Sequence, residues 1–554
     1  MSASSRQLGL VRRALLALGM LALVTTLVLS GLAWRADAWA YDLLQGLRAQ
    51  TADSRIVVVE IDQKSLAALG RWPWSRRVHA QLLDRLAAAG ARSVAFDILL
   101  TEPVLHDPEG DALLAQSMSR YGRTVLPVFA EPAEAGLPAR ETLPIPELAA
   151  AAAGLGHVDL PLDADGVARS LFLQAGVGDP HWPALALAQF QLDQPVAASG
   201  KPLPGLRNPQ PRGSPYLWSR DYKVLVPYVD PPDGFARFSY VDVLQGRVAA
   251  EALRGRWILV GATAAGMGDS LGNPAGYSNA RMSGVVYQAN VLNMLAHGSA
   301  IVPLPLPVQW LLSVLLVLPP LLYILSGRPR PALPATGAAL LAVLLAALCL
   351  HLGHRWFSPM PAVLALLLAG VLLGLRVLRN ARAQALSDPL TGLANRRHFD
   401  ERLEQEIRNS QRSPTPLSLL LIDVDGFKQI NDTLGRTAGD ELLQRLALLL
   451  QGRARRPRDL AARLDGDEFA LLLPETPTHA AATIASAIHA DVGVLRVPAS
   501  SADGRKCSIS IGIHSVYGDQ GQTADEMLVQ ADVALYRARQ NGRNCTATSA
   551  ESLP

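Results

Sequence analysis

Three carboxylates in the last third of the chain have the residue types and the spacing to hold a metal ion. Asp423 stands near the end of the apolar run 417–424, and Asp467 and Glu468 follow an Asp-Gly pair between two apolar runs. Such a pair predicts a two-residue hairpin turn of type I′, because both central residues of that turn need positive φ. The turn places both acidic residues at the mouth of a hairpin, where carboxylates ligate hard cations such as Mg²⁺. The alternative is a solvated acidic turn.

The elements that position these carboxylates follow from hydrophobic periodicity. Strands are predicted at 417–424, 469–474 and 507–516, and helices at 438–450 and 523–541. Strands and helices that interleave in this way indicate one α/β domain. A Lys and an Asn follow Asp423 about one helical turn beyond the end of its strand.

Length and composition place this domain in a larger membrane protein. The chain has 554 residues, 49% of them hydrophobic, which is too long for one core and typical of membrane proteins. The net charge of +3 gives no argument for a nucleic-acid partner. The three cysteines are Cys349, Cys507 and Cys545, so the segment between the first two apolar runs cannot be held by disulfides.

Four apolar segments are long enough to span a membrane as helices. They are residues 14–34, 306–326, 331–350 and 356–375. No small-residue cleavage site follows the first segment, which favours an uncleaved anchor over a signal peptide. Basic residues flank the cytoplasmic ends in the arrangement of the positive-inside rule, which leaves residues 1–13 inside, 35–305 outside and 376–387 as a helical linker inside.

The outer segment reads as a parallel sheet covered by helices. Predicted strands at 55–62 and 92–100 flank a helix at 75–89, which forms a βαβ unit, and 257–261 is a later core strand. Asp62 and Asp97 fall at strand ends, where open α/β sheets bind ligands, although helix capping is the alternative for both.

This segment resembles the second family of CHASE extracytoplasmic sensor domains. The motifs that carry the resemblance are Val-Glu-Ile-Asp at 59–62, Gly-Arg-Trp-Pro-Trp-Ser-Arg at 70–76, Ala-Phe-Asp-Ile-Leu-Leu at 95–100 and Leu-Val-Gly at 259–261. That family places three clustered transmembrane helices and a cytoplasmic output domain after the sensor. The resemblance implies an extracytoplasmic ligand without naming it. Core packing is the favoured reading of the Trp-Pro-Trp aromatics.

Residues 388–548 resemble the GGDEF family of diguanylate cyclases. Five motifs stand in the order and spacing of that family: Asp-Pro-Leu-Thr-Gly-Leu-Ala-Asn-Arg-Arg at 388–397, the run 423–432, Gly-Asp at 439–440, the turn 465–469, and the run 531–544. The resemblance implies a fold like the palm of nucleotide polymerases and adenylate cyclases. It also implies a homodimer in which two domains, each holding one GTP, form cyclic di-GMP and pyrophosphate.

The resemblance further implies roles for individual residues. Asp423, Asp467 and the backbone oxygen of Val424 bind Mg²⁺, with Mn²⁺ as an alternative metal; Asp467 and Glu468 are catalytic, and Glu468 ligates metal or activates the attacking 3′-hydroxyl. The substrate-binding residues are Asn431 and Asp440 at the guanine edge, Phe427 and Lys428 beside them, and Arg539 and Arg543 at the β- and γ-phosphates. A helix cap is the alternative for Asn431, and a surface helix for the two arginines.

Two further features, a short motif and a single substitution, qualify this reading. Arg456 and Asp459 form an Arg-x-x-Asp motif at the distance from the turn at which family members bind product as an inhibitor, although a chance match in an Arg-rich run is the alternative. Asp465 stands where the family has Gly. An extra carboxylate about 8 Å from a phosphate costs roughly 0.5 to 2 kcal/mol, which slows turnover between about twofold and about thirtyfold.

The sequence therefore predicts a multi-domain membrane protein: an α/β extracytoplasmic sensor, four transmembrane helices and a cytoplasmic α/β GGDEF domain. The expected function is a diguanylate cyclase of a bacterial inner membrane, with GTP as substrate and cyclic di-GMP receptors downstream. The alternative is a catalytically silent domain that binds cyclic di-GMP or GTP and signals by contact. A weaker third option is an outer domain that acts as a scaffold for envelope proteins.

Overall fold

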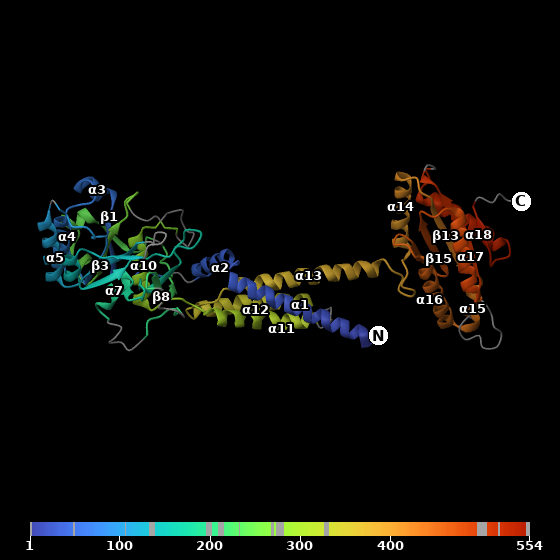
Figure 1. The fold of residues 1–554 in the computed structure, drawn as a ribbon, viewed down its shortest axis with the longest axis horizontal. Coiled ribbons are helices and arrows are strands. Elements are labelled where there is room, and N and C mark those ends of the chain that lie inside the picture. The colour runs from blue at the N-terminus through green and yellow to red at the C-terminus, as the bar shows by residue number, and fades with distance from the viewer. Residues whose placement is uncertain are drawn as a thin grey trace. The chain divides into compact units, whose positions relative to one another are not determined.

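The computed structural model consists of two compact units, residues 1–373 and 374–554, each of which is described by itself (Figure 1). The structure describes residues 3–47, 50–105, 107–131, 139–194, 202–208, 215–231, 233–267, 271–272, 282–325, 332–495, 507–518 and 521–549. The predicted basic loop 327–330 lies outside these ranges.

A seven-stranded, mostly parallel sheet forms the centre of the outer segment. Its strands are β1 (Ile56–Ile61), β2 (Ser93–Asp97), β3 (Thr124–Glu131), β4 (Arg140–Thr142), β5 (Gly154–His157), β9 (Ala236–Ser239) and β10 (Trp257–Ala262). The order is β4-β3-β2-β10-β1-β9, with β5 also paired to β3. The strands are apolar runs because helices cover both faces of the sheet.

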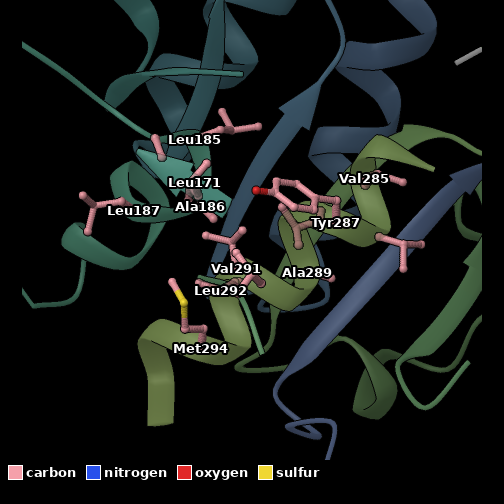
Figure 2. Packing of buried hydrophobic residues seen from close by; sticks show 14 of the residues in the cluster. Leu171, Leu185, Ala186, Leu187, Val285, Tyr287, Ala289, Val291, Leu292 and Met294 are labelled. Carbon is pink, nitrogen blue, oxygen red and sulfur yellow. The ribbon is translucent and has the colours of Figure 1, made fainter. Parts of the chain in front are cut away.

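Two helical layers cover this sheet. The described helices of the outer segment are α2 (Trp34–Gly46), which packs in a separate cluster, and α3 (Gln63–Leu69), α4 (Arg76–Ala88), α5 (Pro108–Tyr121), α6 (Pro146–Ala151), α7 (Leu185–Gln191), α9 (Tyr240–Leu244), the 3₁₀ turn Ala250–Ala252 and α10 (Gly284–His297). Helices α4 and α5 pack on one face, and α7 and α10 on the other. Figure 2 shows buried side chains of α7 and α10, among them Leu187 and Val291, gathered in the second layer. A smaller antiparallel sheet of β6 (Ser170–Val177), β7 (Trp182–Pro183) and β8 (Trp218–Leu225) adjoins it.

The motif residues of the outer segment divide between packing and the sheet edge. Asp62 caps α3 by accepting from the Ser65 backbone N–H at 2.8 Å, so the capping alternative is confirmed there. Trp74 is buried in the same cluster as Phe96, which confirms the core reading for that residue, whereas Trp72 is partly buried against this cluster and also lines a cavity. Asp97 is the last residue of β2 and lines a cavity.

Four helices in the described part of the chain are long and apolar enough to span a membrane. They are α1 (Ala3–Ser30), α11 (Leu306–Leu325), α12 (Ala332–Leu352) and α13 (Met360–Ala385). The first helix ends at Ser30 rather than residue 34, because Gly31 has φ +65° and α2 then starts at Trp34. The last starts at Met360 rather than residue 356, because Arg355–Trp356 forms β12, paired with β11 (Val302–Pro303).

The second unit is an α/β domain on a five-stranded sheet of order β14-β15-β13-β16-β17. Its strands are β13 (Leu417–Val424), β14 (Leu460–Asp465), β15 (Glu468–Pro474), β16 (Ile509–Val516) and β17 (Thr546–Thr548). Its helices are α14 (Arg396–Arg412), α15 (Phe427–Leu434), α16 (Arg436–Arg453), α17 (Thr478–Gly493) and α18 (Ala524–Gln540). Helices α16 and α17 cover one face, and α14 and α18 the other.

Candidate active site

Side chains alternate between the two faces of the central strands, and this alternation brings three carboxylates into one row. Leu419 and Leu421 of β13 point to the face that α14 and α18 cover, so Asp423 points to the same face. Glu468 is paired directly with Asp423, and Asp465 is paired directly with Glu468. Directly paired residues share a face of the sheet, so the three carboxylates line one end of it.

The hairpin turn is displaced by one residue from the predicted position. Its two central residues are Gly466 and Asp467, not Asp465 and Gly466. Of the two, Gly466 alone has positive φ, at +40°, so the predicted type I′ turn is wrong. Glycine at the first central position is the pattern of a type II′ turn. Asp465 is consequently a strand residue, and Asp467 lies on the turn itself.

A polar bridge outside the predicted residues holds this turn. Arg463 donates from Nε and Nη2 to the Gly466 carbonyl at 2.8 and 2.6 Å, and from Nη1 to Asp388 Oδ1 at 3.1 Å. Asp388 also accepts from the backbone N–H and hydroxyl of Thr391. The sequence signal for this anchor was the Asp-Pro-Leu-Thr-Gly-Leu motif, to which no role had been assigned.

The side chain of Arg539, on α18, contacts the acidic row, which consists of Asp423, Glu468 and Asp465. Its Nη2 lies 2.5 Å from Asp423 Oδ1, its Nε donates to Asp423 Oδ2 at 3.0 Å, and its Nη2 is 3.7 Å from Glu468. Gly512 on β16 makes this reach feasible, since a Cβ there would overlap the backbone of Leu535, one turn before Arg539. The guanidinium thus forms a bidentate pair with a carboxylate predicted to bind metal.

Burial raises the pKa of Asp423 to about 6. The paired Arg539 lowers this pKa, whereas the neighbouring negative charges of Asp467 and Glu468 raise it. The donor set fits Mg²⁺, because carboxylates and the Val424 carbonyl supply only hard oxygen ligands. Within the described ranges no group of three or more His, Cys, Asp or Glu side chains is clustered in a metal-binding arrangement.

The residues predicted for guanine come together between α15 and α16. A Cβ on Gly439 would collide with the Asn431 side chain, so the missing side chain at Gly439 makes room for that amide. Asn431 Oδ1 is buried and has no hydrogen-bond partner among the described residues. Asp440, the next residue on α16, is exposed. Together, an amide and a carboxylate would match the acceptor and donor groups of a base edge.

The other predicted substrate residues lie on α15 and after α18. Phe427 is partly buried against the core under α15, and Lys428 is exposed. Arg543 is exposed in the turn after α18, with φ +62°. Asp425, a residue without a predicted role, holds this turn by accepting from the Asn544 backbone N–H at 3.0 Å.

Arg456 and Asp459 form a tight turn at the opposite end of β14 from the hairpin turn. The Asp459 backbone N–H donates to the Arg456 carbonyl, and the Arg456 N–H donates to Asp459 Oδ2 at 2.8 Å. Asp459 Oδ1 is buried without a partner among the described residues. The strand between the two turns, Leu460–Asp465, is six residues long. At 3.3 Å per residue, β14 separates the turn at Arg456–Asp459 from the hairpin turn by roughly 20 Å. The structure therefore does not bring Arg456 and Asp459 to the acidic row.

Two family models match the chain. The CHASE2 domain matches residues 18–324, and the diguanylate cyclase, GGDEF domain matches residues 385–545.

Several curated proteins are similar to the second of these regions. The response regulator PleD of Caulobacter vibrioides is 38% identical over 169 residues, which are 30% of this chain and 36% of that protein. The probable diguanylate cyclase DgcC of Escherichia coli is 37% identical over 172 residues, 31% of this chain and 45% of that protein. The chain therefore spans less than half of these relatives. A solved structure of the coiled coil and GGDEF domain of DgcB from Caulobacter crescentus, in complex with c-di-GMP, covers 34% of this chain and 98% of its own at 30% identity, with a TM-score of 0.32.

Proposed function

The chain belongs to the CHASE2 family and carries a GGDEF domain of the diguanylate cyclase family, and on this basis we propose that it condenses two GTP into cyclic di-GMP. In each of two bond-forming steps a 3′-hydroxyl displaces pyrophosphate from an α-phosphorus. Two such steps between two nucleotides close the ring and release two pyrophosphates. The substrate is GTP, and the catalytic unit is a homodimer, since each domain holds one nucleotide.

The observation that carries this proposal is the acidic row beside Arg539. Asp423 and Asp467, with the Val424 carbonyl, would hold Mg²⁺ or Mn²⁺, and a bound metal would neutralise charge that develops on the phosphates. Arg539, whose guanidinium pairs with Asp423 in this structure, would supply the positive charge for phosphate oxygens. Glu468, opposite Asp423, is placed to orient or deprotonate the attacking hydroxyl.

Guanine selectivity is assigned to Asn431 and Asp440. The buried, unpartnered Oδ1 of Asn431 is an acceptor that a base N–H can satisfy. A base without the matching donors leaves that oxygen unpaired, which disfavours its binding. Lys428 and Arg543, both exposed, supply positive charge for the triphosphate.

The proposed location is a bacterial inner membrane, with the CHASE2 domain outside and the GGDEF domain in the cytoplasm. The four apolar helices and the basic residues that flank them support this orientation. Helix α13 is continuous from Met360 to Ala385, so the last apolar segment and the linker are one helix. A Gly-Gly insertion at Ala383 is expected to remove regulation by the outer domain, whereas unchanged regulation would exclude a rigid helical coupling.

Product feedback is proposed at Arg456 and Asp459. The guanidinium is exposed, and the Asp459 Oδ1 lacks a partner among the described residues, so both can engage a phosphate and a base. The Arg456→Ala variant is expected to keep its initial rate and lose inhibition by added cyclic di-GMP. Equal inhibition of both proteins would exclude this site.

The cyclase proposal is tested with the full chain in lipid nanodiscs, incubated with GTP and Mg²⁺. Wild type is expected to form cyclic di-GMP, and Asp423→Asn to form none. Asp525→Asn, which alters an exposed carboxylate on α18 outside the five motifs, is the matched control and is expected to retain activity. A wild-type protein that binds cyclic di-GMP or GTP yet forms no product would favour the silent receptor.

A further inference from the structure

A cavity of about 390 Å³ opens at the carboxyl edge of the outer sheet. Ile61, Asp97 and Ala262, at the ends of β1, β2 and β10, line it together with Gly284 at the start of α10. The helix after β10 covers one face of the sheet, whereas those after β1 and β2 cover the other. Open α/β sheets bind ligands at such a switch point, and the volume is in the range of small-molecule sites.

The cavity contains a buried hydrogen-bond acceptor without a partner. Gln288, one turn after Gly284 on α10, lines the cavity and is only 5% exposed. Its Oε1 has no hydrogen-bond partner among the described residues. The neighbouring Tyr287 hydroxyl, labelled in Figure 2, already donates to the Ser170 carbonyl at 3.1 Å. A buried amide oxygen without a donor is costly, so a ligand that donates a hydrogen bond there is favoured.

The charge of the lining disfavours an anion. Asp97 carries the one charged side chain among the described lining residues, and its Oδ2 would lie 3.4 Å from a Cβ at Gly284. This carboxylate therefore stands at the amino end of α10, the position that would otherwise attract an anionic ligand. Most of the remaining lining side chains are apolar or aromatic, with Trp72 and Phe129 from two separate segments, although polar and apolar atoms contribute to the cavity surface in similar measure.

We propose that this cavity binds the signal of the outer domain: a small molecule with an apolar body that bears an N–H or O–H donor and no negative charge. The donor satisfies Gln288 Oε1, and the apolar body packs between Trp72, Phe129 and the ends of the strands. An ammonium group also gains from the Asp97 carboxylate. The inference rests on the proposed sensory role of this domain, although binding can be measured without any cyclase activity.

The test uses calorimetric titration of the full chain in nanodiscs with three indole probes of similar size. Tryptamine is a cation, tryptophol is a neutral donor, and indole-3-acetate is an anion. Saturable binding of tryptamine or tryptophol, at least tenfold tighter than that of the acid, is expected.

Gln288→Leu is expected to weaken this binding at least tenfold, and Gln288→Asn, which withdraws the acceptor by one methylene, to weaken it similarly. Gln81→Leu, which alters an exposed glutamine on α4, is the matched control and is expected to bind like wild type.

A structural role for Gln288 would give a different pattern. Because its oxygen is unpaired, Gln288→Leu is expected to leave the melting temperature of the ligand-free protein unchanged or raised. A lowered melting temperature with unchanged probe affinity would make the residue structural and overturn the proposal. Equal or tighter binding of indole-3-acetate, or no saturable binding of any probe to wild type, would also overturn it. Circular dichroism of each variant verifies folding, and Gln288→Asn remains informative if the leucine variant does not fold.

Discussion

The two sheets of this protein place opposite kinds of site at the ends of their strands. At the parallel sheet of the outer segment, β1, β2 and β10 end at a cavity whose described lining includes one carboxylate and one amide oxygen without a partner. At the antiparallel sheet of the GGDEF domain, the edge holds a row of carboxylates and an arginine paired with one of them. The first edge has the chemistry to recognise a molecule, and the second has the charge density to hold metal and phosphates.

The difference lies in how much each edge depends on charge. Asp423 is held in an ion pair and has a pKa raised to about 6, so small changes of charge there alter protonation and metal binding together. The outer cavity depends on a neutral amide and on packing. Charge substitutions should therefore have large effects at the GGDEF edge, and the predictions below run from the largest of them to the smallest.

Replacement of Asp423 by asparagine is expected to have the largest effect. It removes a metal ligand and leaves Arg539 without its paired carboxylate, so kcat for cyclic di-GMP should fall by at least about 10²- to 10³-fold, the size of effect seen when one stabilising group is lost. Rates are measured by liquid chromatography of the nucleotides. A loss of less than about tenfold in a folded variant would contradict the assignment of Asp423 to the metal.

Replacement of Asp465 by glycine should raise turnover. The Asp465 carboxylate stands in the same row as Glu468. Its removal should raise kcat by between about twofold and about thirtyfold, because the repulsion between this carboxylate and the substrate phosphates is lost. Arg396, Arg397 and Arg463 line the same surface hollow and offset part of this negative charge, which places the expected gain near the lower limit. Equal kcat for Asp465→Gly and wild type, at low and high salt, would show that Asp465 exerts no electrostatic effect.

Metal affinity should depend on pH through Asp423. Its pKa is raised, so protons compete with metal below about pH 6, and Mg²⁺ affinity should fall about tenfold per pH unit there. Above about pH 7 the carboxyl is ionised and the affinity should level off. Calorimetric titration of Mg²⁺ between pH 5 and 8, with a non-hydrolysable GTP analogue present, measures this. A slope that persists unchanged to pH 8 would place the titrating group elsewhere.

The smallest effect is expected for Arg539→Lys. Lysine keeps the charge and loses the bidentate geometry, so it should compete less well with metal for Asp423. Because the pair is partly exposed, the gain in Mg²⁺ affinity without nucleotide should be only about threefold, within the range of exposed ion pairs. Weaker Mg²⁺ binding by the lysine variant would mean that Arg539 helps to form the metal site instead of blocking it.

The sequence predicted much of the GGDEF edge because its features are local. Alternation along 417–424 is enough to place Asp423 on the same face of the strand as Leu419 and Leu421, and motif spacing adds Glu468 and Arg539. The turn was misplaced by one residue because both Asp-Gly and Gly-Asp suit two-residue turns, and only the pairing of Asp465 with Glu468 decides between them. The anchor from Arg463 to Asp388 was missed because it joins residues 75 positions apart.

The outer cavity could be predicted only in part. Asp97 was marked by its place at a strand end, but β10 enters the sheet between β1 and β2 from far along the chain, and no local pattern shows that. Gln288 lies inside the apolar helix α10 without any motif around it. Its unpaired oxygen becomes evident only when its neighbours in space are known.

The most direct test of the proposed function is the stoichiometry of the products formed by the full chain from GTP and Mg²⁺. Pyrophosphate and cyclic di-GMP are measured along one time course, with Asp423→Asn as the blank. The account predicts two pyrophosphates for each cyclic di-GMP, and a specific activity that rises with protein concentration until the dimer is saturated. Tight GTP binding without formation of either product would contradict it.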